Sequence, residues 1–565
     1  MFAGIAAPPL ARAPARRQAA GSSKLIFSRR VESAGVGLLV LGTFIFLSFS
    51  YFGQNVHVLS DEFIYSIDAQ HQPLSAAAYP VWAYLKLFSI VRHAGADFYA
   101  AGRLLNALIF SLAIPLIYAT ANYYVSGRWA LLISALAVLG PINSYVAYFM
   151  PEVTYFTAFW LLSWFVLTRQ TWAAVPYGIV VGLLCCLMNL IKPHGMFVLI
   201  AILLVQAACA LFARTREALY RAFVVGLFAA ASFTLARLAI GYLVAGAAGL
   251  SFTGKYSQWT SNDWSEENYS SALRLAWVLL KIHSVAIAAW AGPAIVAVLC
   301  LLRKGVDPSR RLLALYALAV CGLMLAICIV FSVRIVDGMP VIDAFRVHMR
   351  YYNLFFPLFF IAAAGLATPE DRRMSLFTVF IGIAVAVCAA AAALPSIGRL
   401  PFLPVDAPEL RGLVVAGPYW LPAIGGLSAA CCLVLAFRPQ LGSRLYLAAV
   451  LPLAVALATT GIHRDLNTRM TDLPVDRAGK ITRSLLGTEA ASLSIVGGLW
   501  QRWNARFTVN TIGTGDHHLP AGAPIPIDLV SQQTRWLLVL DDRPVPSGWD
   551  LVIGQSPDWY LARRQ

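Results

Sequence analysis

Long runs of apolar residues recur along most of the chain, and the first of them, VGLLVLGTFIFLSFSYF, extends from Val36 to Phe52. An α-helix needs about 20 mainly apolar residues to cross the hydrocarbon core of a bilayer. Runs of this kind are centred near residues 43, 110, 137, 160, 182, 204, 234, 292, 323, 358, 384, 428 and 452. A composition of 59% hydrophobic and 12% charged residues is far from that of a soluble domain. The sequence therefore predicts an all-α polytopic membrane protein with about 13 transmembrane helices.

Basic residues are concentrated in every second connection between the predicted spans. After a basic N-terminal tail, they are Arg128, Arg169, Arg214, Arg216, Arg221, Arg303, Lys304, Arg310, Arg311, Arg372, Arg373, Arg438 and Arg444. Basic connections remain on the cytoplasmic side of a membrane. We therefore expect the other connections and the C-terminus to face the periplasm of a bacterial inner membrane. This topology accounts for much of the net charge of +16, so we do not infer nucleic-acid binding.

Three regions follow from these patterns: a disordered basic cytoplasmic tail over residues 1–33, a transmembrane domain over 34–462, and a soluble periplasmic α/β domain over 463–565. In the last region, VDRAGKITRSLL has a helical pattern, and ASLSIVGG, TRWLLVLDD and WDLVIG have strand patterns. The GDHH stretch, Gly515 to His518, could ligate a metal ion, although a solvated loop is the preferred interpretation.

Two adjacent carboxylates, Asp61 and Glu62, follow the first span in NVHVLSDEFIYSIDAQ. If residues 60–70 are helical, Asp61, Tyr65 and Asp68 share one face. The alternative is a solvated loop beside the membrane.

Further polar residues lie at the outside ends of the predicted spans, where an ionisable group is costly unless it faces water or a partner. They are Arg103 in AAGRLLNALIF, Glu152 in AYFMPEVTYF, and Lys192 and His194 in NLIKPHGMF. Each has an ordinary alternative: an interfacial position for Arg103, a helix start for Glu152 and snorkelling for Lys192.

The segment DAFRVHMRYYNLFFPL places Arg346, His348, Arg350 and Tyr351 before the tenth predicted span. Interfacial anchoring is one explanation. Two arginines on the outside face nevertheless oppose the charge rule, and this suggests an anionic partner.

Carboxylates opposite fixed cations on the outside face suit transfer from a phosphate-linked lipid donor. An acceptor hydroxyl needs a carboxylate to take its proton, or to hold a metal that activates it. A departing phosphate needs Arg or Lys to neutralise its charge. Apolar grooves between spans would hold the lipid chain.

The chain resembles the GT-C superfamily of membrane glycosyltransferases, which contains protein O-mannosyltransferases and the aminoarabinose transferase of lipid A. The resemblance lies in SDEFIY after the first span, GRLLNALIF, GPINSYVAYFMPE and RVHMRYYNLFFP, in this order over roughly residues 35–365. A C-terminal soluble domain on the outside is similar to this family too. The chain has no WWDYG-like signature of oligosaccharyltransferases, and this argues against Asn glycosylation.

The resemblance implies roles for individual residues. Asp61 and Glu62 match an acidic residue or pair that acts as catalytic base or metal ligand, and Glu152 matches a second outside acid. Arg350, together with Lys192 and His194, corresponds to residues that hold the lipid phosphate. Arg103 and Tyr351 complete the expected substrate-binding set.

The expected activity is an inverting glycosyltransferase that moves a sugar from a polyprenyl-phosphate donor to an acceptor hydroxyl. The acceptor could be a glycan, lipid or protein; no cofactor is certain, and a divalent metal is possible. A lipid-linked glycan ligase or polymerase is the main alternative. A secondary transporter would show inverted repeats with broken spans, and the sequence has no such symmetry.

Overall fold

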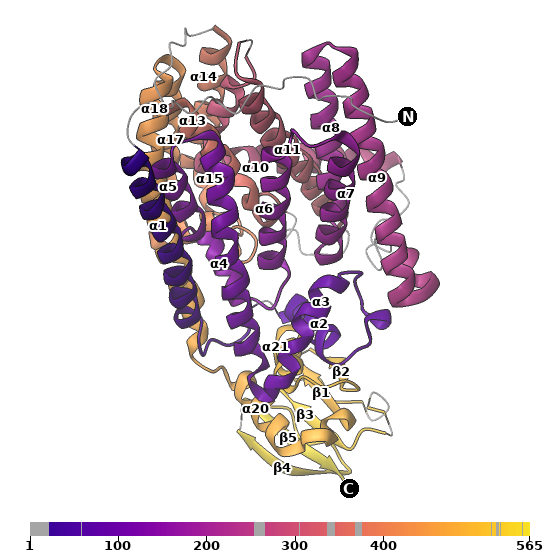
Figure 1. Cartoon of the computed structure of the whole chain (residues 1–565). Helices are drawn as coiled ribbons and strands as arrows, with labels where there is room; N and C mark the ends of the chain where they lie inside the picture. The colour runs from indigo at the N-terminus through magenta and orange to yellow at the C-terminus, as the bar shows by residue number, and fades with distance from the viewer. Residues whose placement is uncertain are drawn as a thin grey trace.

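The computed structural model describes residues 22–57, 59–252, 266–303, 305–335, 345–367, 376–520, 522–526, 530–531, 533–555 and 557–565. A helical bundle forms most of it, and a small domain containing a β-sheet lies at one end (Figure 1). This arrangement confirms the predicted fold class of a polytopic helical protein with a small α/β domain after the last span.

The bundle contains the helices of the chain up to the last span. They are α1 (Ser22–Ser50), α2 (Leu59–Gln70), α3 (Trp82–Phe88), α4 (Phe98–Tyr124), α5 (Gly127–Val138), α6 (Glu152–Thr168), α7 (Ala174–Ile191), α8 (Gly195–Ala213), α9 (Arg216–Ala245), α10 (Glu266–Cys300), α11 (Pro308–Ile335), α13 (Phe356–Ala367), α14 (Leu376–Ala390), α15 (Pro395–Gly398), α16 (Pro408–Ala416), α17 (Trp420–Phe437), α18 (Pro439–Leu445) and α19 (Leu451–Asn467). Residues 22–33 of the predicted tail belong to α1, and residues 1–21 lie outside the described residues.

Within the described residues, ten helices are long and apolar enough to cross a membrane. An eleventh span forms if α5 and the 3-10 segment Pro141–Ala147, which are bent by 48°, are counted together. The predicted spans near residues 160 and 358 instead fall in the shorter apolar helices Glu152–Thr168 and Asn353–Ala367. The predicted count of thirteen is therefore not confirmed.

The short helices α6 and α13 are each preceded by 3-10 turns. Pro141–Ala147 comes before α6, whereas Met349–Tyr351 and Asn353–Phe355 come before α13. Every residue of α13 is buried. Irregular backbone at membrane depth is tolerated where protein surrounds it, so these turns bring polar side chains into the bundle.

The sheet domain begins after α19, which ends at Asn467 and so includes the first residues of the predicted soluble region. It contains α20 (Pro474–Leu486), β1 (Leu493–Gly497), α21 (Leu499–Val509), β2 (Gly515–His518), β3 (Trp536–Val539), β4 (Trp549–Gln555) and β5 (Trp559–Arg564). The strand order is β2-β1-β3-β5-β4. β1 is parallel to β2 and β3, whereas β5 is antiparallel to β3 and β4.

The GDHH stretch is a strand rather than the solvated loop favoured from the sequence. β2 pairs with β1 in the register Ser494↔Gly515, so the sheet satisfies backbone groups that a loop would expose to water. Within the described residues, no group of three His, Cys, Asp or Glu side chains is arranged to hold a metal ion.

Helices α16 and α19 cross at unusually short range. A Cβ atom at Gly412 would lie 2.0 Å from the carbonyl oxygen of Ala458, and one at Gly461 would lie 1.9 Å from that of Gly412. The guanidinium of Arg411 also binds both carboxylate oxygens of Asp465, at 2.8 and 2.7 Å. Glycine at both positions allows the two backbones to meet directly.

Candidate functional site

Helix α2 carries Asp61 and Glu62 in its first turn, so the helical alternative for residues 60–70 holds and the solvated loop does not. Negative side chains are favoured there by the unpaired N–H groups of a helix start. The two carboxylates lie in different environments. The side chain of Asp61 is 37% exposed, whereas Glu62 is fully buried. Asp61 is therefore the one that a substrate can reach.

Glu62 ties the first loop to the bundle. Its Oε2 accepts the backbone N–H of His57 at 3.0 Å. Its Oε1 accepts the Tyr99 hydroxyl at 2.6 Å and the backbone N–H of Phe149 at 2.9 Å. A divalent metal would have to displace these donors, and the cation beside Asp61 is an arginine. The two carboxylates therefore do not fit a metal site.

Arg103 holds the same loop from α4. Its Nε donates to the carbonyl of Ala147 at 2.9 Å, and Nη2 donates to the carbonyl of Asn55 at 3.0 Å. Nη1 donates to the carbonyls of Tyr51 and Gln54. Because its donors are directed at backbone carbonyls, the guanidinium shapes the loop that leads to Asp61.

Arg350 lies among three carboxylates from distant parts of the chain. Its Nη1 is 3.6 Å from Oδ2 of Asp61 and 4.0 Å from Oε1 of Glu152. Its Nε is 3.2 Å from Oδ1 of Asp406. The Nζ of Lys192 donates to Oε1 of Glu152 at 2.8 Å. The structure thus brings together four of the residues selected from the sequence.

Asp406 was not identified from the sequence. This buried carboxylate pairs with Arg346 and lies 3.3 Å from Nδ1 of His348, in addition to its contact with Arg350. It is the internal anionic partner of the cations before α13. Burial alone raises the pKa of Asp406, but the charges of His348, Arg350 and Arg346 lower it below its ordinary value. In the sequence, Asp406 is one of two acidic residues in the long outside connection at 395–418, and Glu409 is the other.

Tyr351 and His194 form an aromatic wall beside the cations. Their ring centroids lie 4.8 Å apart. Nζ of Lys192 lies 5.1 Å from the Tyr351 ring centroid, and the Arg350 guanidinium lies 5.5 Å from it. Burial, reinforced by the neighbouring cations, lowers the pKa of His194 well below its ordinary range. The neutral form of His194 is thereby favoured, and the wall lies against Arg350 and Lys192.

Glu409 is a second acid that the sequence analysis did not select. It is buried in the first turn of α16, and its Oε2 accepts a hydrogen bond from Asn353 Nδ2 at 3.3 Å. Asn353 also donates to the Tyr145 hydroxyl at 2.8 Å. Burial raises the pKa of Glu409 to about 7.

Comparison with known proteins gives matches among solved structures. No protein-family model and no curated protein matches the sequence. The chain is similar to ArnT from Cupriavidus metallidurans in the apo state, with 14% identity over 96% of this chain and 98% of that chain, at a TM-score of 0.46. It is also similar to the oligosaccharyltransferase from Archaeoglobus fulgidus in the apo form, with 11% identity over 91% of this chain and 70% of that chain, at a TM-score of 0.40.

Proposed function

We propose that this chain is an inverting glycosyltransferase. It transfers a sugar from a polyprenyl-phosphate donor to an acceptor hydroxyl on the periplasmic face of a bacterial inner membrane. The observation that carries the proposal is the position of the Arg350 guanidinium, within 4.0 Å of both Asp61 and Glu152. This geometry supports a site where a cation for the leaving phosphate lies beside a base for the acceptor.

Asp61 acts as the base in this proposal. The acceptor hydroxyl gives its proton to Asp61 while its oxygen bonds to the anomeric carbon of the sugar. The bond between that carbon and the phosphate oxygen breaks at the same time, with its electron pair leaving on the phosphate. Attack opposite the leaving group inverts the anomeric configuration. Among the three carboxylates around Arg350, Asp61 suits this role because its side chain is the most exposed.

Arg350 and Lys192 neutralise the departing polyprenyl phosphate. Nη1 of Arg350 lies 3.6 Å from Asp61 and 4.0 Å from Glu152, which is too far for a hydrogen bond to either carboxylate. Nη1 can therefore donate a hydrogen bond to a phosphate oxygen. Lys192 is buried, and burial lowers its pKa although Glu152 opposes this effect. A phosphate dianion or monoanion beside both cations forms charge-assisted hydrogen bonds, which are stronger than neutral ones.

Glu152 positions the acceptor. Its Oε1 binds Lys192, whereas its Oε2 is buried and accepts no hydrogen bond from the described residues. A buried carboxylate oxygen without a donor is costly, and a substrate hydroxyl would satisfy it. Glu62 and Arg103 shape the loop that carries Asp61, and His194 with Tyr351 lines the phosphate side.

The test uses purified protein in detergent with a panel of polyprenyl-monophosphate sugars, each labelled in the sugar. We expect at least one donor to yield free polyprenyl monophosphate and a product of inverted configuration. Consumption of a diphosphate-linked glycan alone would favour the ligase alternative. Export of label from vesicles without cleavage would favour a transporter, and either result would overturn the proposal.

A further inference from the structure

The loop before α2 is held from two sides by arginines that are far apart in the sequence. Arg103 binds the carbonyl groups of residues 51, 54 and 55 from α4. Arg469, in the 3-10 turn Thr468–Met470 that leads out of α19, donates from Nε to the carbonyl of Val56 at 3.0 Å. The contact with Val56 lies five residues before Asp61.

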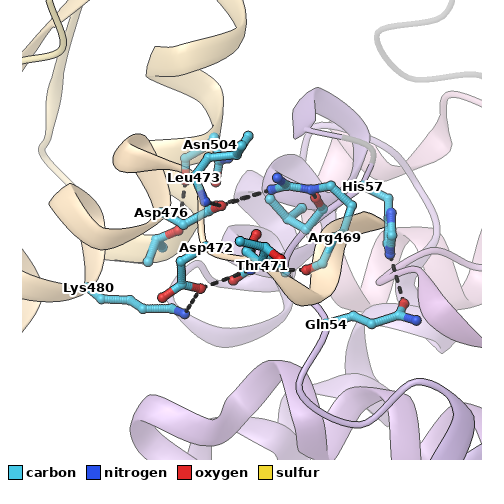
Figure 2. Close-up of polar contacts among 12 residues, drawn as sticks. Gln54, His57, Arg469, Thr471, Asp472, Leu473, Asp476, Lys480 and Asn504 are labelled. Carbon is cyan, nitrogen blue, oxygen red and sulfur yellow. Dashed lines mark hydrogen bonds and ion pairs between the residues drawn. The ribbon is translucent and has the colours of Figure 1, made fainter. Parts of the chain in front are cut away.

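The linker to the sheet domain makes further bonds to this loop (Figure 2). The backbone N–H of Asn55 donates to the carbonyl of Arg469 at 2.9 Å, and its side-chain amide donates to Asp472 Oδ1 at 3.0 Å. Arg469 binds both oxygens of Asp476 at 3.1 and 3.2 Å, and Asp476 is buried at the start of α20. The loop is thereby connected to the first helix of the sheet domain.

The same domain contacts the face of α2 itself. Asn510, which ends α21 in a left-handed conformation with φ of 51°, accepts a hydrogen bond from the Ser66 hydroxyl at 3.2 Å. Its amide donates to Oε1 of Gln70 at 3.2 Å. The guanidinium of Arg506 lies 4.3 Å from the ring centroid of Phe63.

These contacts bracket Asp61, and apart from those of Arg103 they come from the sheet domain or from the linker that leads to it. Asp61 is partly exposed at the start of α2, and Nη1 of Arg350 lies 3.6 Å from its Oδ2. The placement of its carboxylate therefore depends on where the loop and α2 are held. A misplacement of about 1 Å in a reacting group can cost about a hundredfold in rate.

We propose that the sheet domain positions the catalytic loop, with Arg469 and Asn510 as positioning residues that act through Asp61. This inference rests on the proposed function. The domain contacts the loop before α2 and the C-terminal half of α2. It thereby sets the position of the Asp61 carboxylate relative to the acceptor hydroxyl, and it does not affect binding of the donor.

The first experiment compares Arg469→Lys with a matched control in the same domain. Arg543 also pairs with an aspartate, Asp541, and donates to the backbone carbonyls of Ala523 and Pro520. Within the described residues, none of its hydrogen bonds is to α2 or the first loop. We expect Arg469→Lys to lower kcat by at least about tenfold, with the KM for the donor unchanged. Arg543→Lys should leave both unchanged. Equal kcat values for Arg469→Lys and wild type, in monodisperse protein, would overturn the proposal.

The second experiment asks whether the effect passes through Asp61. In an Asp61→Asn background the base is absent, so its placement no longer matters, and Arg469→Lys should cause no further loss of the residual rate. A loss that multiplies with that of Asp61→Asn would assign Arg469 a merely structural role. A wild-type rate for Asp61→Asn alone would instead remove the proposed function, and so the two failures are distinct.

The substitution Asn510→Gly removes the side chain of Asn510 and allows the same backbone conformation. Glycine adopts positive φ freely, so the end of α21 is preserved while the bonds to Ser66 and Gln70 are lost. We expect lower kcat, unchanged KM for the donor and an unchanged midpoint of thermal unfolding. A fall in the unfolding midpoint with normal kcat would contradict the positioning role.

Discussion

Arg350 and Asp406 are joined through both backbone and side chain. The N–H of Arg350 donates to the carbonyl of Asp406 at 2.8 Å, and Nε of Arg350 lies 3.2 Å from Oδ1 of Asp406. This double contact fixes one edge of the guanidinium and directs Nη1 toward Asp61 and Glu152. The arginine is therefore oriented before a substrate arrives, which lowers the cost of ordering it on binding.

Arg350→Lys should weaken donor use, because lysine retains the charge but lacks the planar fork that contacts Asp406 and a phosphate oxygen together. We expect a higher KM for the donor and a lower kcat, with a larger loss for Arg350→Ala. Steady-state kinetics with varied donor checks this. Arg399, which is exposed on the connection before α16, provides the control. If Arg350→Lys, Arg350→Ala and Arg399→Lys all match wild type, Arg350 has no part in catalysis.

Asp61→Asn should lower turnover by about two or more orders of magnitude, because it removes the proposed base and preserves the side-chain shape. Glu62→Gln should cost less, since Glu62 organises the loop through His57, Tyr99 and Phe149. The two losses should not add, because the residues act as one unit. Turnover per folded molecule, measured on a monodisperse fraction, is the readout. Wild-type turnover in Asp61→Asn protein would refute the assignment.

Glu409 should make stability depend on pH. Burial raises the pKa of Glu409 to about 7, so its protonated form is favoured in the folded protein. The free energy of unfolding should therefore fall as pH rises from the unfolded pKa, about 4.3, through about 7. Glu409→Gln should remove this slope, whereas Glu217→Gln at an exposed position of α9 should not. Thermal unfolding in detergent at several pH values tests this, and identical slopes in all three proteins would contradict it.

Topology is testable without any substrate. The sheet domain and α2 lie at one end of the bundle (Figure 1). The charge rule assigns this end to the periplasm. A reporter that is active only outside the cytoplasm should be active when fused at Gln565 and silent when fused near Arg310. The opposite pattern would place the candidate site in the cytoplasm and remove the proposed function.

Much of the fold could be predicted from the sequence, because the length of an apolar run and the basic residues beside it are local properties. The sequence predicted the helical class and the strands β1, β3 and β4, and it left residues 60–70 open between a helix and a solvated loop. Its count of about thirteen spans is not confirmed within the described residues, since an apolar run does not reveal that 3-10 turns precede the short helices α6 and α13. It missed β2 because the pairing with β1 is a non-local contact.

The candidate site divides in the same way. Residues with unusual charge for their position, such as Glu152 and Arg350, could be selected from the sequence. Asp406 and Glu409 could not, because each looks like an ordinary acid of an outside loop until the fold buries it. The separate roles of Asp61 and Glu62 also required the structure, since adjacent residues on a helix point in different directions.

The crossing of α16 and α19 makes two distant segments into one rigid unit. α16 follows Asp406 and contains Glu409, while α19 leads directly to Arg469. With a carbonyl oxygen about 2 Å from where a Cβ would lie at either glycine, neither helix can slide without carrying the other. A tilt of the sheet domain would thus pull on the aspartate that orients Arg350 as well as on the loop of Asp61. Asp61 and Arg350 would therefore move together, and the distance between them would be preserved.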